Sequence, residues 1–476
     1  MIDWDESTYI LIGQGILEGH LPYTELWDVK PPLLFFTFAA IVGLVGKSIV
    51  GIRIVGSLFL STAAFFVFLS ARKLGTTLTG LIAAILFIFM TGEMGGRAIM
   101  SEIIAILPLT AAFYVAITQN KSSKLTHYFL LGILLLIATL VRLNLAYLDL
   151  VVFIYHLLYW LKERKITWLK NIIALSIGFS LPILSVTIPF LVTDHLQVFY
   201  QSVIEAALSY SSSQVSRAET TRGFLQEGFN RGNIFLWLTL VGGIAIVARE
   251  ILWNPTANPN RKPLILLTLW LFAITISIVS SGNIYGHYII QILPFLTTLS
   301  AIFLSADFWG RFRYPIMILF CIGISNLFTP LVEEYRSALA KVRNGISLSN
   351  DQGYRLARFL EEFNPRNEPV YLMEAHIAYW LSDTAPIDRI VAHPSTIAKE
   401  YLLRVMLGEK ATTESVMADI LNKQPLYIVK TLDLLYLREH PKTVKLLNDT
   451  IARDYRPVTR IDDLYIYERR ERGREN

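Results

Sequence analysis

Two adjacent carboxylates, Asp5 and Glu6, stand near the start of the chain and are followed by Tyr9. In a helix, Asp5 and Tyr9 share a face, whereas Asp5 and Glu6 point in different directions. One carboxylate can then act on a substrate while its neighbour is held by the structure. A solvated acidic turn is the alternative for an isolated Asp-Glu pair, so these residues gain meaning only with the motif that follows.

A lysine and two prolines, Lys30-Pro31-Pro32, open an apolar run. The prolines end any helix before them and suit the first turn of the next one. We therefore expect Lys30 at the membrane surface beside a helix start, where backbone N–H groups and an ammonium together suit a phosphate. For Lys30 alone, an interfacial lysine that extends its charge toward water is an equal alternative.

Further polar residues stand at the expected outer ends of apolar runs. Arg97 and Glu102 occur in EMGGRAIMSE, Arg142 lies at a reversal in VRLN, and His287 and Tyr288 occur in GNIYGHYIIQILP. Arg142 fits a contact to a lipid phosphate and a structural cap equally well. A lone histidine and tyrosine at a membrane interface more often pack there than bind a ligand.

Motifs of other chemistries are missing from the sequence. Cys321 is the only cysteine, which excludes disulfide frameworks and cysteine metal sites. The chain has no HExxH motif, histidine cluster, G-x-G-x-x-G motif or P-loop. The sequence therefore demands no metal, and we expect no metal-ligand cluster, no cofactor, and no nucleotide-sugar or ATP site. The D-x-D triplet Asp3-Trp4-Asp5 lies at the extreme terminus and carries little weight.

The composition indicates a membrane protein. Of the 476 residues, 53% are hydrophobic and 17% are charged, and the mean hydropathy is +0.47, whereas soluble domains are about a quarter charged. The net charge of +5 does not indicate nucleic-acid binding, because the positive residues of the apolar part lie mostly in short loops. We predict about ten spans, at 49–71, 78–91, 103–117, 128–140, 143–161, 172–192, 234–247, 264–279, 288–304 and 315–331.

Positive charge predicts the orientation. Short loops rich in lysine and arginine alternate with short loops that carry little positive charge, and the positive loops are expected in the cytoplasm. The opposite face then receives residues 93–102, 193–232 and 280–288 together with the C-terminal residues. We expect a multi-pass protein of the plasma or inner membrane whose site and C-terminal domain are extracytoplasmic.

The N-terminal residues raise a topological question. Residues 1–30 are acidic with one lysine, and the downstream charges place the start of the first span outside. Residues 31–46 would form a helix of about 24 Å, shorter than the roughly 30 Å hydrocarbon core. We favour a helix at the outer surface over a true span. An upstream apolar helix is then expected in the functional protein, in addition to this chain.

We predict an α-helical polytopic membrane protein with a small C-terminal α/β domain. Residues 1–48 form an extracytoplasmic catalytic loop with a juxtamembrane helix, 49–331 the multi-span domain, and 332–476 the soluble extracytoplasmic domain. In this last part helical and β-like patterns alternate, which predicts a short sheet covered by helices. The helical runs are 351–363 and 396–407, and the β-like runs are 369–373, 425–431 and 464–470. Acceptor recognition and a lid over the site remain alternative roles for this domain.

Residues 5–36, DESTYILIGQGILEGHLPYTELWDVKPPLLFF, resemble the first external loop of the GT-C membrane glycosyltransferases. The nearest groups are the protein O-mannosyltransferases and the aminoarabinose transferases that act on lipid A. The shared pattern is an Asp-Glu pair, a tyrosine three residues after the Glu, and a later Lys-Pro-Pro. Ser101-Glu102 and GHYIIQILP also look like this superfamily. The chain departs from the family in starting with Met1 only four residues before Asp5, where the family has a membrane helix.

The resemblance implies a glycosyltransferase whose donor is a polyprenyl-phosphate-linked sugar. The acceptor would offer a hydroxyl group on a protein, lipid or glycan, and we expect inversion at the anomeric carbon. By that match Asp5 corresponds to the catalytic base and Lys30 to the residue that holds the lipid phosphate. The remaining candidates for substrate binding are Glu6, Tyr9, Arg97, Glu102, Arg142, His287 and Tyr288.

Two other classes of protein remain as alternatives. One is a polytopic lipid or sugar transporter or flippase without transfer chemistry, although the chain has no halves of similar pattern and no matching pair of interrupted spans. The other is a membrane scaffold that presents the soluble C-terminal part. Neither the sugar nor the acceptor can be read from the residues.

Overall fold

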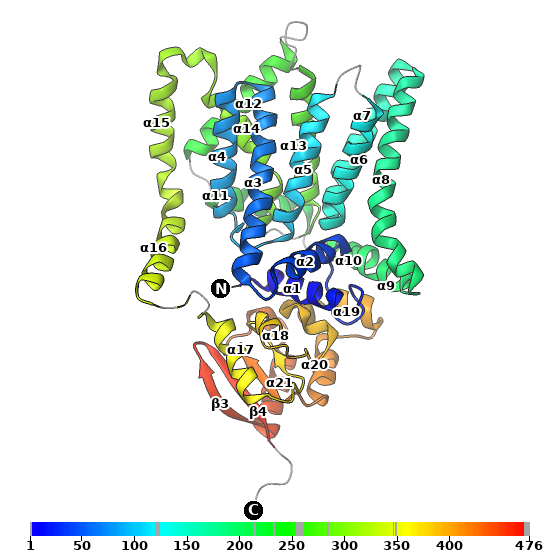
Figure 1. The fold of residues 1–476 in the computed structure, drawn as a ribbon, viewed down its shortest axis with the longest axis vertical. Helices are drawn as coiled ribbons and strands as arrows, with labels where there is room; N and C mark the ends of the chain where they lie inside the picture. Colours follow the sequence, from blue (N-terminus) through cyan, green and yellow to red (C-terminus); the bar gives the residue numbers. More distant parts are fainter. Residues whose placement is uncertain are drawn as a thin grey trace, which may run out of the picture. The chain divides into compact units, whose positions relative to one another are not determined.

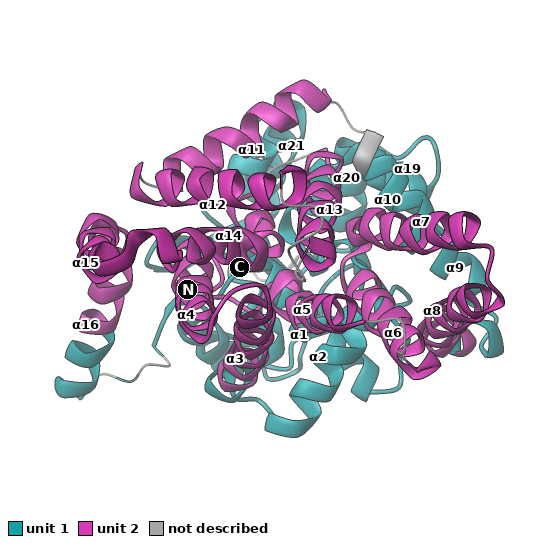
Figure 2. Cartoon of the chain, turned by 90° about the horizontal axis from the view of Figure 1, so that it is seen from above, with its two compact units in different colours: residues 1–52, 189–213, 338–476 teal, residues 53–188, 214–337 magenta. Residues whose placement is uncertain are grey.

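The computed structural model describes residues 2–119, 124–212, 216–231, 234–253, 261–282, 285–345, 347 and 350–470. Parts of the predicted outer loops 193–232 and 280–288, and the end of the predicted C-terminal domain, lie outside these residues. The chain forms two compact units, coloured separately in Figure 2. Unit 1 contains residues 1–52, 189–213 and 338–476, and unit 2 contains residues 53–188 and 214–337.

Unit 2 consists of helices, most of which are apolar. They are α3 (Ile49–Leu74), α4 (Thr77–Glu93), α5 (Ser101–Thr118), α6 (Leu125–Val141), η1 (Leu143–Leu145), α7 (Ala146–Glu163), α8 (Ile166–Val192), α11 (Arg217–Arg231), α12 (Ile234–Leu252), α13 (Arg261–Val279), η3 (Gly286–Gln291), α14 (Leu293–Leu304), η4 (Asp307–Phe312), α15 (Arg313–Ile324), η5 (Ser325–Phe328) and α16 (Thr329–Arg343). Three helices of this series, α3, α8 and α16, contain residues of both units.

The helices of the described residues confirm the expected multi-pass membrane fold. Seven helical stretches are long and apolar enough to cross a membrane, and four shorter apolar helices accompany them. All ten predicted spans coincide with helices, apart from the turn residue Ile292 within the span 288–304. Large apolar side chains such as Leu58 and Phe65 on α3 and Ile177 and Leu181 on α8 are exposed, as expected for helices that face lipid rather than water.

Two glycines let α6 and α8 approach within unit 2. A Cβ atom on Gly132 would lie 2.3 Å from the carbonyl oxygen of Leu175, and one on Gly178 would lie 2.2 Å from that of Phe129. Distances this short exclude any side chain at either position. Small residues at such crossings are typical of helix pairs in membranes, where close van der Waals packing drives association.

Unit 1 combines the two N-terminal helices with a small α/β part. Its helices are α1 (Trp4–Leu17), α2 (Pro32–Val45), α9 (Leu196–Tyr200), η2 (Gln201–Glu205), α10 (Ala206–Ser212), α17 (Gln352–Phe363), α18 (Ile377–Leu381), η6 (Arg389–Ala392), η7 (Pro394–Ala398), α19 (Glu400–Leu407), α20 (Thr413–Asn422), η8 (Leu435–Leu437) and α21 (Pro441–Asp454). Its strands are β1 (Tyr371–Leu372), β2 (Tyr427–Lys430), β3 (Tyr455–Ile461) and β4 (Leu464–Arg469).

The strands form one four-stranded sheet in the order β1-β2-β4-β3. β1 pairs with β2 in parallel, and the other two pairs are antiparallel, with β3 and β4 forming the hairpin seen in Figure 1. Leu447 of α21 and Met417 and Ile420 of α20 belong to the buried cluster that also includes Ile428 of β2. The expected small C-terminal α/β part is therefore confirmed, with one strand, β3, beyond the runs that the sequence predicted.

Helices α1 and α2 pack tightly against each other. A Cβ atom on Gly13 would lie 2.8 Å from the backbone nitrogen of Ala39, so the two backbones touch at this point. α2 begins directly after Pro31, as the Lys-Pro-Pro motif predicts, with a proline in its first turn. The predicted division at residues 48 and 331 stays a prediction; the compact units place residues 1–52 together with the C-terminal part.

Candidate functional site

Asp5 lies in the first turn of α1, where helix geometry favours a negative charge. The side chain of Asp3 caps the helix by accepting a hydrogen bond from the backbone N–H of Asp5, at 2.9 Å. The unpaired N–H groups and the dipole of a helix N-terminus stabilise carboxylates near them. The start of α1 therefore fixes the backbone of Asp5 and favours its ionised form.

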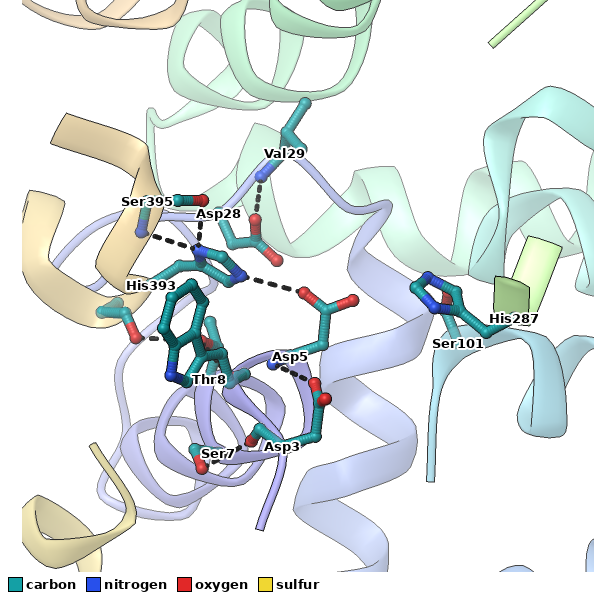
Figure 3. Close-up of polar contacts among 12 residues, drawn as sticks. Asp3, Asp5, Ser7, Thr8, Asp28, Val29, Ser101, His287, His393 and Ser395 are labelled. Atoms are coloured by element: carbon teal, nitrogen blue, oxygen red, sulfur yellow. Dashed lines mark hydrogen bonds and ion pairs between the residues drawn. The ribbon is translucent and has the colours of Figure 1, made fainter. Parts of the chain in front are cut away.

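A histidine from the C-terminal part of unit 1 contacts this carboxylate. His393 Nε2 lies 3.0 Å from Asp5 Oδ1, and both side chains are largely buried, at 10% and 19% exposure. Figure 3 shows the imidazole between Asp5 and Ser395. His393 was not among the residues that the sequence singled out.

Other contacts hold the start of α1 against the C-terminal part of unit 1. The indole N–H of Trp4 donates to Glu374 Oε2 at 3.0 Å, and its ring packs edge-on against Tyr436 at 5.7 Å. One turn later, Thr8 Oγ1 donates to the carbonyl oxygen of Ala392 at 2.9 Å. Residues on both sides of Asp5 are thus held by groups that lie more than 360 positions further along the chain.

Glu6 and Tyr9, which the sequence predicts as substrate contacts, lie in the interior of unit 1. Neither side chain is exposed to solvent. The Tyr9 ring packs against Phe35 and Phe38 of α2, with ring centroids 6.1 Å and 5.3 Å apart. Asp5 and Glu6 therefore do occupy different environments, one at the edge and one in the interior. Their roles toward a substrate stay predictions.

Lys30 lies in the turn that leads into α2. Its carbonyl oxygen accepts a hydrogen bond of 2.7 Å from the Tyr23 hydroxyl, and Tyr23 is completely buried with a φ of 72°. Nearby, the buried Asp28 accepts a hydrogen bond from the backbone N–H of Val29 at 2.7 Å. The backbone of Lys30 is therefore held in place, which leaves the flexible side chain to carry its charge.

A second lysine belongs to the same group of charges. Burial lowers the pKa of Lys399, which precedes α19; Asp28 and Asp5 act in the opposite direction, and Lys30 adds to the lowering. The Lys399 ammonium also lies 5.7 Å from the centroid of the Tyr210 ring. Two carboxylates and two ammonium groups therefore interact in one region of unit 1, and Lys399 is a member that the sequence did not reveal.

Unit 2 gathers three of the other candidates around Glu102. Arg142 Nη1 lies 2.7 Å from Glu102 Oε1 and also donates to the Ser101 hydroxyl at 3.0 Å. Glu102 is 1% exposed and Arg142 is 6% exposed. A buried carboxylate of this kind needs its cation, because an unpaired charge in the interior is strongly destabilising.

His287 and Tyr288 complete the Glu102 group. His287 Nε2 lies 3.8 Å from Glu102 Oε1, and the Arg142 guanidinium carbon lies 4.2 Å from the centroid of the Tyr288 ring. The sequence predicts these residues separately, and the structure brings them together. Arg97 is placed elsewhere: it pairs with Glu334 at 2.6 Å and with Glu93 at 3.5 Å, and it is partly exposed.

Metal binding has little support in the part of the chain that the structure describes. Among those residues, histidine, cysteine and acidic side chains form no group of three or more that could hold a metal ion. Asp5 and His393 form only a pair. That the protein works without metal or other cofactor stays a prediction.

The comparisons with known proteins agree with this architecture. Residues 29–192 match the family model of dolichyl-phosphate-mannose-protein mannosyltransferases, over about a third of the chain. A search of curated proteins gave no match.

Among solved structures, ArnT from Cupriavidus metallidurans is similar in fold, in its apo state (TM-score 0.57) and bound to undecaprenyl phosphate (0.58). Both are 15% identical and align over 98% of this chain and 93% or 94% of the other. The apo oligosaccharyltransferase of Archaeoglobus fulgidus is 12% identical with a TM-score of 0.50, over 90% of this chain and 65% of that one.

The family match over residues 29–192 and the similar folds confirm the resemblance to GT-C glycosyltransferases that residues 5–36 indicate. The chain is a multi-pass membrane protein with the fold of membrane glycosyltransferases.

Proposed function

We propose that the chain transfers a sugar from a polyprenyl-phosphate-linked donor to a hydroxyl group of an acceptor, with inversion, on the extracytoplasmic face of the membrane. The observation that carries this proposal is the group of charges in unit 1. It joins Asp5 at a helix start with Lys30 from the Lys-Pro-Pro motif and with Lys399. A base and cations for a leaving phosphate are the two kinds of group that such a transfer needs.

Asp5 acts in this proposal as the general base. The acceptor oxygen attacks the anomeric carbon while the bond between that carbon and the phosphate oxygen breaks. The acceptor proton passes to the carboxylate of Asp5. Attack from the face opposite the phosphate inverts the anomeric carbon.

Lys30 and Lys399 act on the leaving side. The lipid phosphate departs with the electron pair of the broken bond, so negative charge grows on its oxygens. An ammonium group beside these oxygens stabilises that charge more strongly in the transition state than in the bound donor. Lys399 interacts electrostatically with Lys30 and also with Asp28 and Asp5, so the lysines and the proposed base belong to one group of charges.

The Glu102 group of unit 2 is proposed to contact sugar or phosphate. Glu102 holds Arg142 by the 2.7 Å ion pair, and His287 lies at the edge of the pair. Arg97 is assigned a weaker phosphate contact, since it already pairs with Glu93 and Glu334.

A cavity inside unit 1 supports acceptor recognition by the C-terminal part. It measures about 860 Å³, and Gln14 of α1 lines it together with Asp383, Asp388, Asp419 and Lys423. α1 also carries Asp5, so an acceptor held along this helix would extend toward the base. The excess of carboxylates favours a neutral or cationic acceptor over an anionic one.

The comparisons support the donor class at the level of fold. A similar fold in a protein whose structure contains undecaprenyl phosphate makes a polyprenyl phosphate a reasonable ligand here. The partial match to mannosyltransferases that use dolichyl phosphate mannose agrees with that choice.

The decisive experiment separates chemistry from binding. We would compare the wild-type protein, Asp5→Asn and the matched control Asp449→Asn, an exposed carboxylate of α21. Products would be measured by mass spectrometry of glycolipids and glycoproteins in a deletion strain that expresses each variant. Binding of undecaprenyl phosphate to the purified proteins would be measured by native mass spectrometry.

Asp5→Asn should abolish product formation and keep undecaprenyl phosphate binding, and Asp449→Asn should retain both. Unchanged products in Asp5→Asn would remove Asp5 as the base. If the wild-type protein moves a lipid across the membrane but transfers no sugar, the transporter class is favoured instead.

A further inference from the structure

The segment from Arg389 to Lys399 is held against the start of α1. Thr8 Oγ1 donates to the carbonyl oxygen of Ala392 at 2.9 Å. The backbone N–H of Trp27, in the loop before α2, donates to the carbonyl oxygen of Arg389 at 3.1 Å. The Trp4 ring meets the His393 ring edge-on at 6.2 Å. These contacts flank Asp5 on both sides, so the position of His393 relative to Asp5 is set by the backbone and not only by the pair itself.

The capping of a short helix orients the His393 ring. His393 is the N-cap of η7, and its Nδ1 accepts a hydrogen bond from the backbone N–H of Ser395 at 3.3 Å. The Ser395 hydroxyl lies 3.2 Å from the same nitrogen. A backbone N–H can only donate, so Nδ1 must present its lone pair. The proton of the neutral imidazole is then on Nε2.

This tautomer directs a donor at Asp5. The Nε2–H group faces Asp5 Oδ1 at 3.0 Å (Figure 3). Hydrogen bonds to an ionised carboxylate are among the stronger ones in proteins, and they favour the charged form over the protonated form. Because one oxygen of the carboxylate is fixed, the orientation of the other is fixed as well.

We propose that His393 is the positioning residue of the base: its Nε2–H group holds Asp5 ionised and correctly turned for the acceptor hydroxyl. The inference rests on the proposed function and adds a residue from the C-terminal part to it. Here His393 does not receive the acceptor proton. Its arrangement resembles the histidine and carboxylate pairs of other enzymes with the roles exchanged, since the carboxylate is the base and the imidazole orients it.

Other charged groups also act on this pair and must be considered in any pH profile. Asp3 caps the same helix, Asp28 and Lys30 come from the loop before α2, and Lys399 follows η7. Glu374 accepts the indole N–H of Trp4 next to Asp5, and burial raises its pKa to about 7, so its titration falls within the measured range. Near the start of α18, burial lowers the pKa of His376 to about 3, and His393 acts in the same direction. His376 is therefore neutral throughout the working range and adds no titration to it.

The test compares His393→Ala, His393→Gln and the control His195→Ala in the full-length protein. His195 lies at the start of α9 in the same unit and contacts Thr193 rather than Asp5. The rate of sugar transfer would be measured from pH 4 to pH 9, together with undecaprenyl phosphate binding and the thermal midpoint Tm.

His393→Ala should lower kcat about 10- to 100-fold with little change in donor KM. The acidic limb of the kcat/KM profile should move about one pH unit upward, because loss of the hydrogen bond makes Asp5 easier to protonate. The amide N–H of Gln can replace the Nε2–H donor, so His393→Gln should recover much of the rate and of the profile. His195→Ala should match the wild type.

Two results would overturn the positioning role. One is an unmoved acidic limb in His393→Ala, and the other is an equal loss in the Ala and Gln variants at a wild-type Tm. The Asp5→Asn variant shows whether a failure concerns His393 alone or the proposed function. If Asp5→Asn is inactive while His393→Ala behaves as the wild type, only the role of His393 fails; if Asp5→Asn is fully active, the proposed base itself fails.

Discussion

Glu374 offers a test of how the C-terminal part holds α1, independent of any substrate. Its carboxylate accepts the indole N–H of Trp4 at 3.0 Å, next to Asp5. Burial raises the pKa of Glu374 from 4.5 to about 7; the bond from Trp4 lowers it, and Asp463 raises it further. The substitution Glu374→Gln keeps the shape and an acceptor for the indole N–H but removes the charge.

The pKa of Glu374 determines both the sign and the size of the effect. Between pH 4.5 and 7 the folded protein holds this proton more firmly than the unfolded chain, so wild-type stability falls as the pH rises through that range. A rise from 4.5 to about 7 corresponds to about 3 kcal/mol above pH 7. Because water screens a partly exposed group, we halve this to about 1.5 kcal/mol.

Thermal unfolding of the whole protein in nanodiscs would measure the effect. At pH 8 the Tm of Glu374→Gln should exceed that of the wild type by about 1–2 °C, and at pH 4 the two should coincide. The control Glu361→Gln changes an exposed residue of α17 and should show no pH-dependent difference. A Tm difference that is the same at both pH values, or a less stable Gln variant at pH 8, would refute the reasoning.

Three further outcomes follow from contacts described above. Lys30→Met should lower the initial rate of transfer about 10- to 100-fold, and Lys30→Arg should keep part of it; equal rates would return Lys30 to a simple interfacial role. Arg142→Gln leaves Glu102, 1% exposed, without its 2.7 Å partner, so it should destabilise the protein by about 3–5 kcal/mol; an unchanged Tm would contradict this. Reporter fusions after Asp351 should read as extracytoplasmic, and a cytoplasmic signal would overturn the orientation.

Much of the fold was readable from local patterns. The apolar runs predicted all ten helical segments, and the proline after Lys30 predicted the start of α2. The ends were less readable: α8 begins at Ile166, six residues before the predicted start, because lysine and tryptophan interrupt its first turns without breaking the helix. β3 was missed because the residues of Tyr455–Ile461, YRPVTRI, do not alternate between apolar and polar side chains. Pairing with β4 decides their structure.

The site was readable only in part. Asp5 and Lys30 carry a recognisable motif, but their partners His393 and Lys399 do not. The residues from His393 to Thr396, HPST, have the local signal of a helix start. This signal explains why His393 caps η7, but it does not indicate that the same ring contacts Asp5. His393 pairs with a residue 388 positions away, and a contact at that separation leaves no trace in one sequence.

The composition of unit 1 has a consequence for how the protein is made. Its three stretches come from the beginning, the middle and the end of the chain. Asp5 leaves the ribosome 388 residues before His393, which at 5–20 residues per second is roughly 20–80 s. During that interval α1 lacks the residues that hold its first turn, and a chain cut short before residue 389 never acquires them. Assembly of the charged group around Asp5 therefore waits for the segment from Arg389 to Lys399, so chains terminated before this segment would reach the membrane with their spans formed but without a finished site.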